Sequence, residues 1–210
     1  MPQGFDYWTT RPKNDPRGDW GDSGNWIQGY WQSQDHPHRQ LIVKELYAIR
    51  DVGSILELGC NCGPNLAYIR DHFPIPELEL AGIDANTDAI ALATERLPSA
   101  DFKIGNLLNL PWNKQFDVVI ADAVLMYISP AEIAQAMKEI ARVAKKAVII
   151  IDRFDESVGG EIVGHVWGRN YERLLDRFGF KARKEKLADD DWPTSENWKK
   201  YGYLFVGTKE

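Results

Sequence analysis

Short apolar runs alternate along the chain with segments whose apolar residues recur at helical spacing. The middle of the chain carries runs of strand length at residues 54–58, 79–84, 101–105, 116–121 and 147–152. The periodic segments among them predict helices over residues 65–72, 87–97 and 129–144. Alternation of strand and helix predicts a parallel sheet with helices on both faces, and therefore an α/β fold.

Further elements are predicted on both sides of this alternating core. A helix from about Pro37 to Arg50 precedes it, with apolar residues on one face. After it the pattern predicts a loop (RFDESVGGE), a helix from about His165 to Phe178, and strands over residues 181–187 and 201–208. The chain has no internal repeat and no domain linker.

Two of the helices have recognisable starts. Asn65 is expected to cap the helix over residues 65–72, because its side chain can accept a backbone N–H. Ser129 is placed as the cap of the helix over residues 129–144, with Pro130 in the first turn. Glu132 completes a capping box with Ser129.

The N-terminal stretch is turn-rich yet aromatic. Residues 1–31 contain several prolines and glycines together with Phe5, Tyr7, Trp8, Trp20, Trp26, Tyr30 and Trp31. A disordered tail would be poor in aromatic residues. We expect residues 1–36 to form an irregular arm that packs on a single domain of residues 37–210. The arm either covers a helix face or acts as a lid over the active site.

A glycine-containing turn follows the first strand. Glu57 leads into the turn, and Asn61 stands between Gly59 and Gly63. Asparagine is one of the few other residues that enter the left-handed region at low cost. A strand, tight turn and helix in this order let backbone N–H groups approach a nucleotide-like ligand. A Cβ at either glycine is expected to occupy ligand space.

Asp84 ends the second apolar run, at the spacing of about twenty residues after the glycines where an acidic side chain meets a ribose in nucleotide-binding folds. The ribose diol offers two O–H donors, and one carboxylate accepts both. The turn and Asp84 together predict a site for a nucleoside.

These residues and two later motifs make the chain resemble the class I S-adenosylmethionine (SAM)-dependent methyltransferases. The pattern E-x-G-x-(G/N)-x-G from Glu57 is similar to motif I of that family, and Asp84 matches motif II. Residues 105–107 resemble the motif III loop, and residues 116–128 (FDVVIADAVLMYI) resemble motif IV. The resemblance, over about residues 55–152, implies a Rossmann-like, doubly wound, mostly parallel seven-stranded sheet with an antiparallel last strand.

The resemblance also implies SAM as cofactor, S-adenosylhomocysteine as product, and no metal ion. The residues expected to hold the cofactor are Glu57, Gly59, Cys60, Asn61, Gly63, Asp84, Ala85, Asn106, Leu107, Asp122 and Arg39. Asn106 would accept from the adenine amine, and the Leu107 N–H would donate to a ring nitrogen. Arg39 would meet the methionine carboxylate; a surface arginine is the alternative.

Asp122 and His165 are the candidate catalytic residues. Asp122 follows the fourth strand, where the resemblance places the methyl group, and would orient or deprotonate the substrate. A carboxylate that caps a loop is the alternative. His165 titrates near neutrality and is a candidate general base, as are His36 and His38. For all three, a surface or capping histidine is the alternative.

Cys60 and Cys62 raise the question of a metal or redox site. No second set of paired Cys or His ligands appears, so small side chains that fill a tight loop are the favoured interpretation. Two cysteines this close do not make an ordinary disulfide framework, and the N-terminus MPQGFDYW lacks a signal pattern. We therefore expect a reduced, cytoplasmic protein.

Composition bears mainly on the acceptor. The chain has 210 residues, 44% hydrophobic and 27% charged, which is typical of a globular domain. The net charge of −6 disfavours a nucleic-acid or anionic-membrane partner, and no apolar run approaches the length of a membrane span. We expect a methyltransferase that acts on a small molecule, such as a sugar or another secondary metabolite, as a monomer or homodimer.

Other functions remain open at this point. The acceptor is alternatively a protein or an RNA. The chain is alternatively a SAM-binding regulatory protein without catalysis. An NAD-binding oxidoreductase shares the turn geometry, but it favours G-x-G-x-x-G/A where this chain has Asn61 and Pro64, and it usually needs a second catalytic region.

Overall fold

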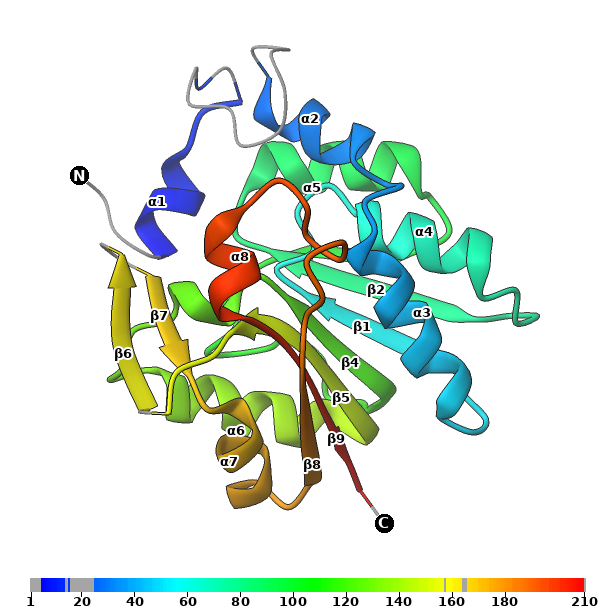
Figure 1. Ribbon diagram of the computed structural model, residues 1–210. Helices are drawn as coiled ribbons and strands as arrows, with labels where there is room; N and C mark the ends of the chain where they lie inside the picture. The colour runs from blue at the N-terminus through cyan, green and yellow to red at the C-terminus, as the bar shows by residue number, and fades with distance from the viewer. Residues whose placement is uncertain (1–4, 14, 16–24, 157, 164–165, 210) are drawn as a thin grey trace.

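The computed structural model describes residues 5–13, 15, 25–156, 158–163 and 166–209, and its centre is a seven-stranded sheet (Figure 1). The strand order is β3-β2-β1-β4-β5-β9-β8. The strands are β1 Ser54–Leu58, β2 Glu79–Asp84, β3 Asp101–Ile104, β4 Phe116–Asp122, β5 Ala144–Arg153, β8 Lys181–Lys186 and β9 Gly202–Thr208. Strand β9 is antiparallel to both β5 and β8, whereas β1 to β5 pair in parallel. The predicted fold class is confirmed.

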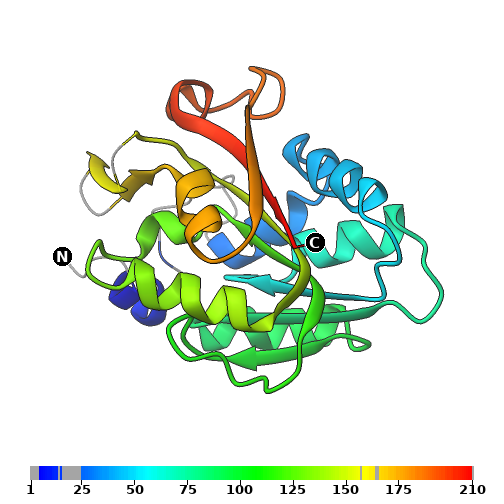
Figure 2. The same cartoon turned by 90° about the horizontal axis from the view of Figure 1, so that it is seen from below.

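Helices cover both faces of the sheet. One apolar core joins the sheet to α3 His38–Ala48, α4 Pro64–His72 and α5 Thr87–Arg96. A second core joins the other face to α6 Ile133–Val143 and α7 Tyr171–Arg177, on the opposite side of the sheet from α3 and α4 (Figure 2). Neighbouring residues of β5 divide between the two cores, with Ile149 in the first and Ile150 in the second. A central strand buried on both faces explains the continuous apolar run in the sequence.

The predicted start of α6 is wrong by four residues. Glu132 is the residue before the helix, and residues 129–132 form a turn in which the Ser129 carbonyl accepts the Glu132 and Ile133 N–H groups. The Ser129 hydroxyl donates to the Glu132 carboxylate at 2.6 Å. The two side chains that would make a capping box therefore bond to each other, and neither caps the helix backbone.

The region between β5 and β8 also differs from the prediction. In place of a loop and a helix from residue 165, the chain forms a hairpin of β6 Val158–Val163 and β7 Val166–Arg169. Helix α7 begins only at Tyr171, because the Asn170 side chain accepts the Arg173 N–H at 3.1 Å and caps it there. The glycines of the sequence RFDESVGGE are part of a strand, so they did not mark a loop.

The N-terminal arm is not irregular throughout. It contains α1 Phe5–Thr10 and α2 Trp26–Gln32, and the Asn25 side chain caps α2. The Trp26 indole is buried and donates to the Pro12 carbonyl at 3.0 Å. Trp20 lies outside the described residues. The division of the chain at residue 36 and the lid role of the arm stay predictions.

Two short helices lie where the sequence predicted none: the 3₁₀ helix η1 Leu125–Tyr127 and α8 Glu196–Tyr201. The helix η1 comes directly after β4, and α8 comes directly before β9. None of the helices in the described part of the chain combines the length and apolar character that a membrane crossing needs.

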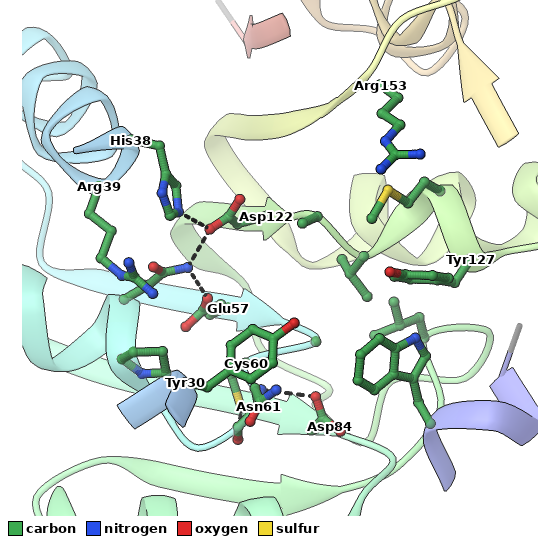
Figure 3. Close-up of a pocket in the computed structure, with 18 of the residues that line it drawn as sticks. Tyr30, His38, Arg39, Glu57, Cys60, Asn61, Asp84, Asp122, Tyr127 and Arg153 are labelled. Carbon is green, nitrogen blue, oxygen red and sulfur yellow. Dashed lines mark hydrogen bonds and ion pairs between the residues drawn. The ribbon is translucent and has the colours of Figure 1, made fainter. Parts of the chain in front are cut away.

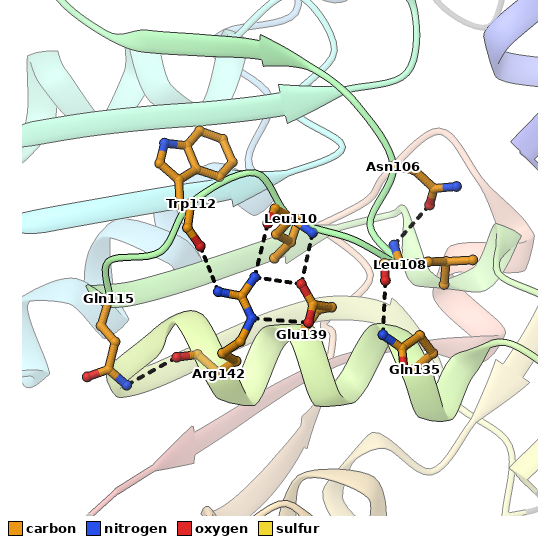
Figure 4. Close-up of polar contacts among 8 residues, drawn as sticks. All are labelled: Asn106, Leu108, Leu110, Trp112, Gln115, Gln135, Glu139 and Arg142. Atoms are coloured by element: carbon orange, nitrogen blue, oxygen red, sulfur yellow. Dashed lines mark hydrogen bonds and ion pairs between the residues drawn. The ribbon is translucent and has the colours of Figure 1, made fainter.

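The loop between β3 and β4 is tied to α6 by polar contacts (Figure 4). The Arg142 guanidinium donates to the Trp112 carbonyl at 2.6 Å and to the Leu110 carbonyl at 3.0 Å. Glu139 pairs with Arg142 and accepts the Leu110 N–H at 2.9 Å. These contacts hold in place the loop that begins at the carboxyl end of β3.

Candidate functional site

A cavity of about 440 Å³ lies at the carboxyl edge of the sheet (Figure 3). It is bordered by the ends of β1, β2, β4 and β5, where the strand order reverses between β1 and β4. Ligands of open α/β sheets bind at such a switch point. The residues that carry its chemistry are Tyr30, His38, Arg39, Glu57, Gly59, Cys60, Asn61, Asn65, Asp84, Ala85, Leu107, Asp122, Tyr127, Arg153, Trp192 and Trp198.

The turn after β1 has the backbone that the sequence predicted. Gly59, Asn61 and Gly63 have φ angles of 67°, 51° and 80°, all in the left-handed region. The Gly59 and Cys60 N–H groups donate to the Ile83 carbonyl at 2.8 and 3.0 Å, which ties the turn to β2. The turn therefore places Asn61 beside the end of β2.

The expectation that a Cβ on Gly59 or Gly63 would occupy ligand space is wrong. A Cβ on Gly59 would lie 2.3 Å from Val124 Cγ2, and a Cβ on Gly63 would lie 3.2 Å from the Phe102 ring. A Cβ on either glycine would therefore meet side chains of the protein. Gly63 does not line the cavity and is the residue before α4.

Alanine at Gly59 should destabilise the protein more than alanine at Gly179. Both glycines have positive φ, but a Cβ on Gly179 meets nothing within 4 Å. Each substitution costs about 1–2 kcal/mol for the left-handed backbone. Gly59→Ala adds the displacement of Val124, roughly another 1–3 kcal/mol. Urea unfolding measures both, and equal losses would contradict the packing role of Gly59.

Asp84 is held by the turn it faces. Its Oδ2 accepts the Asn61 N–H and its Oδ1 accepts the Asn86 N–H, both at 2.9 Å. Burial raises the pKa of Asp84, although these N–H groups act against the rise. Each carboxylate oxygen has a further lone pair for a donor in the cavity.

Asn65 joins two buried carboxyl groups and does not cap α4. Its Nδ2 donates to Glu57 Oε1 at 2.6 Å and to Asp122 Oδ2 at 2.8 Å. Three buried oxygens have no hydrogen-bond partner among the described residues: Glu57 Oε2, Asn65 Oδ1 and Asp122 Oδ1. Burial raises the pKa of Glu57 well above its usual range. A buried acceptor without a donor is costly, so these atoms favour a ligand that carries several donors.

Asp122 is paired with a histidine from the helix before the core. His38 Nε2 lies 2.8 Å from Asp122 Oδ2, and the His38 ring stacks on Trp192 with centroids 4.3 Å apart. Burial alone would raise the pKa of Asp122, but His38, Arg39 and Asn65 outweigh it and hold that pKa below its usual value. Burial lowers the pKa of His38, and its Nε2 fixes the orientation of the Asp122 carboxyl group.

Arg39 is buried and is not a surface arginine. Only 3% of it is exposed, and it lines the cavity. Its Nη1 donates to the Ser33 carbonyl at 2.5 Å and its Nη2 to the Ser33 hydroxyl at 3.2 Å, while Nε has no partner. It can therefore face an anion beside the Glu57 cluster.

The two residues predicted to contact adenine, Asn106 and Leu107, differ in their position relative to the cavity. Leu107 lines the cavity, whereas Asn106 does not, and the Asn106 side-chain oxygen accepts the Leu108 N–H at 2.9 Å. The Asn106 oxygen keeps a second lone pair, and its contact with adenine stays a prediction. His165 lies outside the described residues.

The cysteines are buried free thiols. Cys60 lines the cavity, and the Cys62 thiol donates to the Ile27 carbonyl at 3.3 Å. The described residues contain no group of three or more His, Cys, Asp or Glu side chains arranged for a metal ion. Cys62 packs with Trp26 and Ile27 of α2, whereas Cys60 belongs to the core that joins the sheet to α3, α4 and α5.

Sequence reasoning missed one wall of the cavity. Trp192 and Trp198 stack with ring centroids 4.0 Å apart, and the Arg153 guanidinium lies 5.5 Å from the Trp198 ring centroid. Tyr127 of η1 also lines the cavity. A signal was present in the sequence, since two tryptophans stand between the predicted strands over residues 181–187 and 201–208.

Comparisons with known proteins agree with this geometry. Residues 55–147 match the model of a methyltransferase domain. The chain is 28% identical over 153 residues to the bifunctional methionine biosynthesis protein MetXA/MetW of Rhodopirellula baltica, covering 69% of this chain and 22% of that protein. It is 24% identical over 104 residues to a trans-aconitate 2-methyltransferase of Variovorax paradoxus, covering 49% of this chain and 39% of that protein. The chain therefore spans well under half of either relative.

A solved structure extends the likeness to nearly the whole fold. The magnesium protoporphyrin IX methyltransferase ChlM from Synechocystis, solved with bound SAM, superposes with a TM-score of 0.67. The match covers 98% of this chain and 95% of that chain at 16% sequence identity. At this identity the likeness concerns the fold.

Proposed function

We propose that this chain belongs to the class I SAM-dependent methyltransferase family and transfers the methyl group of SAM to a small-molecule acceptor. The observation that carries the proposal is the cavity at the switch point of the sheet. It brings together the turn after β1, the Asp84 carboxylate and the buried acceptors around Glu57.

The residues on the β1 and β2 side fit SAM. Asp84 has free lone pairs for the two ribose hydroxyls. Glu57 Oε2 and Asn65 Oδ1 are buried acceptors that lack donors, and the ammonium group of an amino acid supplies three. Arg39 Nε is a buried donor without an acceptor and suits the carboxylate of the same group. Leu107 supplies an apolar contact for the adenine ring.

The residues on the β4 side fit the transfer step. SAM supplies a methyl group on a positively charged sulfur, so the protein mainly has to align the acceptor and exclude water. Asp122 Oδ1 has no hydrogen-bond partner in the described part of the chain and can accept a hydrogen bond from a hydroxyl or an amine of the methyl acceptor. His38 holds Asp122 Oδ2 and so orients this oxygen.

The cavity supports a small acceptor. Its volume of about 440 Å³ lies in the range of small-molecule sites. Trp8 and Tyr127 pack edge to face with centroids 5.3 Å apart and give it an aromatic wall for a sugar or another ring. The free thiols of Cys60 and Cys62 are in keeping with a reducing, cytoplasmic setting.

Calorimetry should show that S-adenosylhomocysteine binds, that NAD does not, and that binding releases protons. Burial raises the pKa of Glu57 and of Asp84, so both hold protons in the free protein at pH values where exposed carboxyl groups are ionised. The ammonium and ribose hydroxyls are donors and favour the ionised carboxylates, so binding expels these protons. Affinity should therefore rise with pH above the usual carboxyl range.

Titrations in two buffers with different ionisation enthalpies, at one pH, measure the protons released. Equal heats in both buffers would contradict the carboxyl contacts. Tight binding of NAD without binding of S-adenosylhomocysteine would overturn the proposed function itself.

A further inference from the structure

Arg153 is the last residue of β5 and reaches the cavity from the β5 side. Its backbone pairs with Gly202 of β9, and its N–H donates to Asp152 Oδ1 at 2.7 Å. Figure 3 shows its side chain above Tyr127, on the side of the cavity away from Arg39 and Glu57. The backbone of Arg153 is therefore fixed, while its guanidinium faces the cavity.

The Arg153 guanidinium has no acceptor in the described part of the chain. Its Nε is buried without a hydrogen-bond partner, and it makes no ion pair with a described carboxylate. The carboxyl group of its neighbour Asp152 accepts the backbone N–H groups of Arg153 and Met126. In contrast, Arg39 donates to Ser33. A partly buried guanidinium without an acceptor favours an anion.

The cavity has two parts that differ in the charge and the type of their lining side chains. Its lining carboxylates are Glu57, Asp84 and Asp122, which come from the ends of β1, β2 and β4. Arg153 lies against Trp198, which stacks on Trp192, and above Tyr127 (Figure 3), and Thr194 and Ser195 also line the cavity. If the cofactor takes the carboxylate part, the part around Arg153 is left for the acceptor.

We infer that Arg153 binds a carboxylate or phosphate group of the methyl acceptor, whose planar apolar body lies against Trp198 and Tyr127. The inference rests on the proposed function, because it assigns the rest of the cavity to the cofactor. A guanidinium suits this role, since its planar fork donates two parallel hydrogen bonds to either anion. The acceptor is thus an organic acid or a phosphate ester.

The test uses three probes that share a ring and differ only in the head group: 2-naphthoate, 2-naphthyl phosphate and the neutral 2-naphthamide. Each is titrated calorimetrically into protein saturated with S-adenosylhomocysteine. In the wild type at least one anion should bind roughly tenfold to a hundredfold more tightly than the amide. The preferred anion identifies the head group of the acceptor.

Arg153→Gln should remove this preference and leave the affinities for the amide and for S-adenosylhomocysteine within about threefold. Arg70→Gln is the matched control, because Arg70 is exposed and pairs with Asp71, and it should change nothing. Melting curves without ligand should agree among the three proteins. An amide that binds wild type as tightly as both anions, or anion binding that survives Arg153→Gln, would overturn the inference. Loss of S-adenosylhomocysteine binding in the wild type would instead refute the proposed function.

Discussion

Asp84→Ala should weaken the binding of SAM and of S-adenosylhomocysteine by roughly thirty- to a thousandfold while the protein stays folded. The carboxylate is expected to accept both ribose hydroxyls, and hydrogen bonds to a charged group contribute about 1.5–3 kcal/mol each. The two bonds are coupled, so a total of about 2–4 kcal/mol is reasonable, at about 1.4 kcal/mol per tenfold change. Asp84→Asn should be milder, because one acceptor oxygen remains.

Asp122→Asn is the comparison for this experiment. Asp122 lines the same cavity but is assigned to the acceptor, so its loss should leave cofactor affinity within about threefold and reduce turnover. The measurements are calorimetric affinities, melting curves without ligand, and turnover with an acceptor. Cofactor binding by folded Asp84→Ala within about threefold of wild type would show that the ribose assignment is wrong.

Arg169→Met should lower the free energy of unfolding by about 3–5 kcal/mol. Arg169 is fully buried, and its Nη1 and Nη2 donate to the carbonyls of Leu125, the first residue of η1, and Ile128, the residue after η1. It also lowers the pKa of the buried Asp152, which burial raises to about 7. The substitution takes the Arg169 donor from both carbonyls, of which Leu125 keeps the Ile128 N–H, and it removes the larger of the two arginine charges that act on the Asp152 carboxyl group.

Arg173→Met is the matched control, because this arginine lies on the surface of α7 with 63% of its side chain exposed and pairs with Glu156. Its loss should cost less than about 0.5 kcal/mol. Urea unfolding compares the two variants. A loss below about 1 kcal/mol for Arg169→Met would mean that the η1 carbonyls find other donors. The loss for Arg169→Lys should lie between those for Arg169→Met and Arg173→Met, because lysine keeps the charge but lacks the planar pair of donors.

The sequence predicted those features of the structure that depend on a local pattern of residues. The strands, the left-handed Asn61 and the position of Asp84 depend on residues that are close in the chain. The pairing of His38 with Asp122 joins residues 84 positions apart, and no local pattern reports it. Arg153 meets Trp198 only because β5 pairs with β9. Asn65 was predicted as a cap, but α4 begins one residue earlier at Pro64, and the Asn65 Nδ2 donates to two buried carboxyl groups.

The place of β9 bears on how the chain folds during synthesis. Strand β9 lies between β5 and β8 in the sheet, although it follows both in the chain (Figure 1). Until residues 202–208 leave the ribosome, β8 has no partner in the sheet, and β5 presents an open apolar edge on the nascent chain. An unpaired apolar edge is a site for aggregation. When a ribosome stalls before residue 202, we expect chaperones to recognise the nascent chain. In that chain Trp198 and Arg153 are not yet held together by the pairing of β5 with β9.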